Sequence, residues 1–138
     1  MPENATELSA AISLRSEELK EEIKKLMDRQ EDVQEDILEL QRRKRSGQDI
    51  DETRLTQLKE VRKEASQMIG LLALERTELL DDLPVIRLAT GKLKVVASEL
   101  EEDAALIDQA AEKLKRATEA LERAEKVLVK VISLVGGL

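Results

Sequence analysis

The sequence contains no phenylalanine, tryptophan or tyrosine, so leucine, isoleucine, valine and alanine must fill any hydrophobic interior. Aliphatic side chains suit the packing of helix against helix. Two prolines and five glycines are few for a β fold, which needs a turn about every ten residues. These scarcities favour an all-α protein, and a chain of 138 residues fits a single helical domain over residues 1–138.

Cysteine and histidine are also absent. Without cysteine the chain forms no disulfide and has no thiol chemistry, and without histidine it lacks the most frequent general base and metal ligand. The fragment Thr90-Gly91-Lys92 matches only the end of a phosphate-binding loop and follows no strand. Most carboxylates lie off the apolar positions and are interpreted as a solvated acidic face. We therefore expect no enzyme, no catalytic residue, no cofactor and no metal site.

A net charge of -7 argues against general nucleic-acid binding, because the phosphate backbone repels an acidic protein. The missing aromatics remove the stacking platforms that single strands use. No apolar run approaches the ~20 residues of a membrane span, and the first residues resemble no signal peptide. A cytoplasmic protein is the expectation.

The clearest positive pattern is a seven-residue repeat in the C-terminal third. Large aliphatic residues occupy every seventh position: Leu93, Leu100, Ile107, Leu114, Leu121, Leu128 and Val135. Small residues such as Ala110, Ala117 and Ala124 stand three positions further on. This heptad pattern is typical of a helix packed against other helices, as in coiled coils.

Periodicity and turn residues predict three helices, over about residues 5–45, 50–81 and 84–135. Asn4 is the predicted cap of the first helix, Gly47 the residue just past its end, and Asp49 the cap of the second. Within the first helix, Gln30 interrupts the apolar positions. It either fixes the helix register or lies in a loose, hydrated layer.

The second boundary depends on the run Asp81-Asp82-Leu83-Pro84. Because proline disrupts a helix interior, we place a tight turn there. The alternative is one kinked helix that continues past Pro84, with Thr90-Gly91 as a further weak point. The apolar run of residues 68–74 is expected at the centre of the bundle.

Folding the chain back at Gly47 and at Pro84 places Leu72 beside Ile23 and beside Val95 and Val96. The result is a long antiparallel hairpin extended to an up-down-up three-helix bundle or coiled coil. In this register the last ~20 residues, about 119–138, extend some 30 Å past the hairpin. The alternative is a tail that folds back onto its own bundle.

An uncovered apolar overhang would be an interaction surface. Its candidate interface residues are Leu121, Val127, Leu128, Val131, Ile132 and Val135. The leading hypothesis is thus a non-enzymatic adaptor or assembly subunit that forms a homo-oligomer or binds a partner protein.

Two further hypotheses remain open. In the first, the protein is membrane-active, and its C-terminal tail or the 68–74 run inserts at a bilayer. In the second, it is a small inhibitor or immunity protein whose acidic helical face binds a basic target. One basic cluster, Arg42, Arg43, Lys44 and Arg45, is a possible anion contact. It also suits the negative end of a helix dipole, which is the interpretation we favour.

Overall fold

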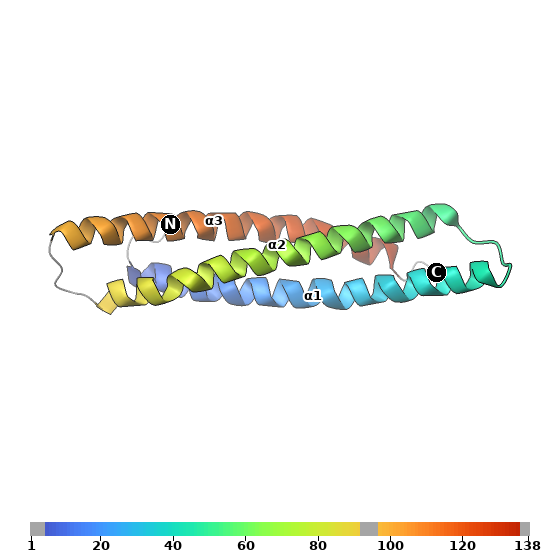
Figure 1. Ribbon diagram of the computed structural model, residues 1–138, viewed down its shortest axis with the longest axis horizontal. Helices are drawn as coiled ribbons and strands as arrows, with labels where there is room; N and C mark the ends of the chain where they lie inside the picture. The colour runs from blue at the N-terminus through green and yellow to red at the C-terminus, as the bar shows by residue number, and fades with distance from the viewer. Residues whose placement is uncertain (1–4, 92–96, 136–138) are drawn as a thin grey trace.

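The protein is a bundle of three long helices. The computed structural model describes the backbone of residues 5–91 and 97–135, and the surroundings of side chains for residues 7–81, 105 and 107–135. The helices are α1 (Ala5–Arg45), α2 (Glu52–Gly91) and α3 (Ala97–Leu134). They lie side by side along their lengths, and each contacts the other two (Figure 1). The predicted all-α, up-down-up three-helix bundle is confirmed.

The turn between α1 and α2 forms where the sequence predicts it. Gly47 has a φ of 84°, a left-handed conformation that glycine adopts without a steric penalty. The main-chain nitrogen of Gln48 donates a hydrogen bond of 3.0 Å to the carbonyl oxygen of Arg43. The cap of α2 is Asp51, whose Oδ1 accepts a hydrogen bond of 3.1 Å from the main-chain nitrogen of Arg54. The prediction of Asp49 as this cap is wrong by two positions, and the predicted cap Asn4 lies outside the described residues.

The second boundary differs from the prediction. Helix α2 continues through Pro84 to Gly91, and α3 begins at Ala97. The turn predicted at residues 81–84 is therefore wrong. The helix continues past Pro84, as the alternative expected, but α2 and α3 are two separate helices and not one kinked helix. One interior proline costs about 3 kcal/mol. The burial of Met68, Leu72 and Leu79 against the other helices offsets a cost of that size.

The later end of α2 and the later start of α3 change the register of the third helix. Arg116 pairs with Glu78 at 3.3 Å, and Arg54 reaches the carbonyl oxygen of Leu134 at 2.6 Å. Compared with a turn at Pro84, each residue of α3 is displaced along α2 by about 20 to 26 residues, or about 30 to 40 Å at the rise of an α-helix. That displacement is at least as long as the predicted overhang. The segment from residue 119 to 135 therefore lies against α1 and α2, and the predicted overhang is wrong.

The register of α1 against α2 agrees with the prediction, because Arg62 bonds to Gln30 and Gln34 across the two helices. Ile23 also packs against the cluster that contains Leu72. Val95 and Val96, which were expected beside Leu72, lie outside the described residues. Leu72 instead shares its cluster with Ala117 and Ala120 of α3.

The core consists of two clusters. The larger contains Leu8, Ile12, Leu19, Leu26, Met68, Leu72, Leu79, Ala110, Leu114, Ala117, Ala120 and Ala124. The smaller contains Val33, Ile37, Leu40, Leu55, Leu58, Val61, Ala65 and Val131. In the larger cluster α3 contributes mainly alanines, and Ile107, Leu121 and Leu128 are only partly buried beside it. Small side chains at the centre of a contact allow two helix axes to approach closely.

A polar contact between α1 and α2 lies between these clusters. The Nε2 atom of Gln30 donates hydrogen bonds to the hydroxyl of Ser66 and, at 3.3 Å, to the carbonyl oxygen of Arg62. Arg62 in turn donates to Oε1 of Gln34 at 2.7 Å. Gln30 thus makes specific contacts with α2 in a half-buried layer rather than lying in a loose one.

Candidate functional site

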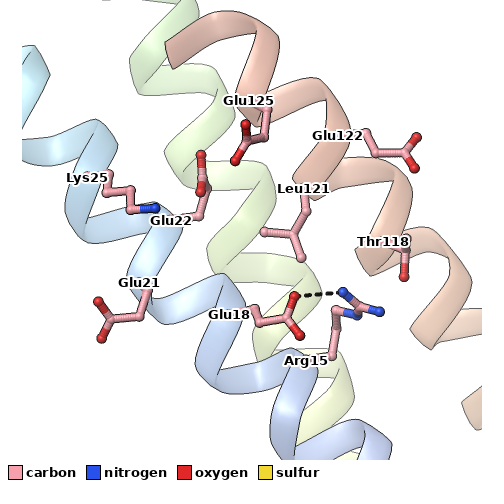
Figure 2. A pocket seen from close by; sticks show the side chains of 9 residues that line it. All are labelled: Arg15, Glu18, Glu21, Glu22, Lys25, Thr118, Leu121, Glu122 and Glu125. Atoms are coloured by element: carbon pink, nitrogen blue, oxygen red, sulfur yellow. Dashed lines mark hydrogen bonds and ion pairs between the residues drawn. The ribbon is translucent and has the colours of Figure 1, made fainter. Parts of the chain in front are cut away.

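Three surfaces of the bundle are candidates for function, and the most polar is a groove between α1 and α3. Its volume is about 460 Å³. It is lined by Arg15, Glu18, Glu21, Glu22 and Lys25 of α1 and by Thr118, Leu121, Glu122 and Glu125 of α3 (Figure 2). Five carboxylates face two cations, so the groove is acidic.

Glu22 is the unusual residue of this groove. Only 4% of its surface is exposed, and its Oε1 atom is buried without a hydrogen-bond partner among the described residues. Its carboxylate and that of Glu125 point toward one another across the groove (Figure 2). Burial, and next the negative charge of Glu125, raise the pKa of Glu22, whereas the nearby ammonium of Lys25 acts in the opposite direction.

The remaining charges of the groove are arranged around this pair. Arg15 forms an ion pair of 2.8 Å with Glu18, and Glu21 and Glu122 are exposed. In the ranges for which side chains are described, no group of three or more acidic residues is placed to hold a metal ion. The excess of carboxylates over cations in the groove favours the binding of a positively charged group.

A second candidate surface is the outward side of α2 between residues 66 and 80. Every exposed residue there is uncharged: Ser66, Gln67, Gly70, Ala73, Leu74, Thr77 and Leu80. We call this set the uncharged face. Leu74 is 55% exposed, so the expectation that the whole 68–74 run lies at the centre of the bundle is wrong. Only one side of that run, with Met68 and Leu72, is buried.

Gly70 stands near the middle of the uncharged face. A Cβ atom added at Gly70 would meet nothing within 4 Å, so packing inside the bundle does not require glycine there. A glycine in a helix interior costs about 1 kcal/mol relative to alanine. Close approach of another backbone is one use for such a position.

The third surface is the one predicted from sequence, at the end of α3. Val131 is fully buried, whereas Leu121, Val127, Leu128 and Val135 are partly buried against the core. Ile132 is 46% exposed and lies near Val129, which is 64% exposed. Most of the predicted interface residues thus contribute to the interior of this bundle, because the helix that bears them lies against α1 and α2.

The basic cluster engages carboxylates of its own chain. Arg42 and Arg43 both contact Glu39, at 2.6 Å and 3.1 Å, and Lys44 pairs with Glu52 across the turn at 2.8 Å. The hydrogen bond from Arg42 is the main cause that lowers the pKa of Glu39. Arg45 is exposed. These contacts agree with a structural role at the end of α1, and binding of an external anion stays a prediction.

Sequence reasoning missed both the acidic groove and the uncharged face. The spacing of Glu22 from the apolar positions shows that it borders the interior, but the identity of its neighbour depends on the α1–α3 register. The uncharged face is visible in the sequence only once the buried positions of α2 are known.

Comparison of the chain with protein-family models, with curated proteins and with solved structures finds no match to any of them. Over the residues that the structure describes, no helix is long and apolar enough to cross a bilayer.

Proposed function

We propose that this chain is a non-enzymatic assembly protein that pairs with a second copy of itself through the uncharged face of α2. The observation that carries the proposal is the absence of charge from every exposed position between residues 66 and 80. Elsewhere the exposed positions are mostly charged, and the net charge is -7. Two copies of an acidic protein repel one another, and this face lets them meet without like charges in contact.

Charge and shape along α2 favour an antiparallel, two-fold arrangement centred on the level of Leu72. Lys63 and Asp81 are both exposed and stand nine residues before and nine residues after Leu72. In an antiparallel isologous pair centred on Leu72, a residue that precedes Leu72 in one copy lies opposite the residue that follows Leu72 by the same number of positions in the second copy. Lys63 of one copy then lies opposite Asp81 of the second copy, so opposite charges flank the contact at both ends.

The same symmetry places Leu74 of one copy opposite Gly70 of the second copy, since these residues stand two positions after and two before Leu72. A large exposed side chain then fills the space that a glycine leaves, on both sides of the two-fold axis. This pairing supplies a role for Gly70 that packing within one chain does not.

Light scattering after gel filtration, over a range of concentrations, tests the proposal. The unaltered protein is expected to give a dimer, and Leu74→Glu a monomer, because the contact would then bury two carboxylates, one from each copy, without partners. Leu14→Glu is the matched control: Leu14 is 64% exposed on α1, so this variant should remain dimeric. A monomer at all concentrations, or equal dissociation of both variants, contradicts the proposal.

A charge-reversal series tests the antiparallel register itself. Lys63→Asp and Asp81→Lys each place like charges opposite one another, and each should weaken the dimer. The double variant restores opposite charges and should recover the affinity. Failure of the double variant to recover it excludes this register.

A further inference from the structure

One oxygen of the buried Glu22 carboxylate, Oε1, has no hydrogen-bond partner within the part of the chain that the structure describes. The residue is 4% exposed. A buried polar atom without a partner costs free energy, and a second carboxylate, Glu125, points toward it across the groove (Figure 2). Two carboxylates from different helices thus converge without a cation between them.

The two cations of the groove do not fill this position. Arg15 is held by Glu18 at 2.8 Å. Lys25 forms no ion pair with Glu22 or Glu125 in the part of the chain that the structure describes, and its ammonium acts on Glu22 only through space. The groove therefore keeps an excess of negative charge around Glu22.

The geometry points to a binding site for an arginine side chain of a partner protein, with its guanidinium between Glu22 and Glu125. A guanidinium presents five N–H donors in a planar fork and is weakly hydrated, so it suits partly buried carboxylates. Leu121 and Thr118, which also line the groove, offer a partly apolar wall to the aliphatic part of the side chain. The volume of about 460 Å³ accommodates one such side chain.

This site is independent of the proposed dimer. The groove is lined by residues of α1 and α3, whereas the uncharged face belongs to α2, so both can be occupied together. Binding at the groove and pairing through α2 are measured separately, and the failure of either leaves the other standing.

NMR titration of the full chain with the capped tripeptide Ala-Arg-Ala tests the inference. We expect saturable shifts of the side-chain carboxyl resonances of Glu22 and Glu125. The same peptide with citrulline, the neutral isostere of arginine, should cause none. Glu22→Gln and Glu125→Gln should each weaken binding about tenfold, as expected for loss of one charged hydrogen-bonding partner.

Glu17→Gln is the matched control, because Glu17 is an exposed carboxylate of α1 that does not line the groove. It should change the affinity less than twofold. Equal weakening by Glu17→Gln, binding of the citrulline peptide, or no saturable shift with Ala-Arg-Ala overturns the inference. Tighter Glu22-dependent binding of spermidine than of the peptide would replace the protein partner with a polyamine. Glu125 is exposed, so its variant keeps the test valid if Glu22→Gln fails to fold.

Discussion

Arg54 and Leu134, which are separated by 80 positions in the sequence, are joined by a hydrogen bond of 2.6 Å from the guanidinium Nη2 to the main-chain carbonyl oxygen. The same Nη2 atom lies 3.7 Å from Oδ2 of Asp36 on α1. Arg54 therefore links the start of α2 to the end of α3 and to α1. A cation at a helix C-terminus is also favoured by the helix dipole. This contact fixes the register in which the end of α3 is covered.

Arg54→Ala should lower the free energy of unfolding by about 2 kcal/mol, because a charged hydrogen bond is lost and Asp36 keeps a partly buried charge without its partner. Urea denaturation at neutral pH measures the change. Lys59→Ala, at an exposed position of the same helix, is the control and should change it by less than about 0.5 kcal/mol. Equal effects of the two substitutions would mean that Arg54 does not anchor α3.

The burial of two glutamates predicts that stability depends on pH. Burial raises the pKa of Glu22, with Glu125 adding to the shift and Lys25 opposing it. Burial also raises the pKa of Glu75, with Glu78 adding to the shift and Arg116 opposing it. Since both groups hold a proton more tightly when folded than when unfolded, their contribution to stability increases as the pH falls from neutral through the raised pKa values.

The stabilisation from protonated Glu22 and Glu75 is complete below about pH 4.5, the pKa of an unfolded glutamate. Below that pH, ionised carboxylates such as Glu39 become protonated and lose their ion pairs, which opposes the stabilisation. Thermal unfolding between pH 7 and pH 4.5 measures the trend. In Glu22→Gln and Glu75→Gln the dependence on pH should be shallower, and each variant should be more stable at pH 7 by about 1 kcal/mol, since no buried charge remains. An unchanged pH profile in both variants would contradict this assignment.

Substitution by alanine should have opposite effects on stability at Gly47, which precedes α2, and at Gly70, which lies inside α2. Gly70→Ala should raise the free energy of unfolding of the monomer by up to about 1 kcal/mol, since the added Cβ meets nothing within 4 Å. Gly47→Ala should lower it by about 1 kcal/mol, since Gly47 has a positive φ. Urea denaturation at a concentration that keeps the protein monomeric gives both values. If the uncharged face pairs as proposed, Gly70→Ala should also weaken the dimer, and a dimer of undiminished affinity would exclude close contact at Gly70.

The sequence predicts the fold class and the first hairpin because local signals are strong there. Gly47, the heptad spacing of α1 and the acidic start of α2 all indicate the same turn. The large residues at every seventh position of α3 mark its inner side, but Ala117 and Ala124, three positions on, are fully buried, whereas Leu121 and Leu128 are only partly buried beside them. Small side chains at the centre of a contact allow helices to approach closely.

The site could not be predicted from sequence because it depends on which residues of α1 and α3 lie at one level. Glu22 lies near Glu125 only when α2 extends to Gly91 and α3 begins at Ala97. With the turn expected at Pro84, α3 would be shifted by many residues along α1 and α2, and its end would be uncovered. One wrong boundary thus leads to the expectation that the end of α3 is uncovered, whereas most of its predicted interface residues pack against the core.

Pro84 itself supplies the sharpest test of this register. The structure has Pro84 inside α2, where it lacks the N–H of an interior helical residue and hinders the preceding turn. Pro84→Ala should therefore increase the free energy of unfolding by about 1–3 kcal/mol. The helix content measured by circular dichroism should be unchanged or slightly higher. Pro2→Ala, a change of the same kind outside the described helices, serves as the control and should have little effect. If a turn stood at Pro84 instead, alanine would lose the favourable restriction that proline gives to a turn, and stability would fall.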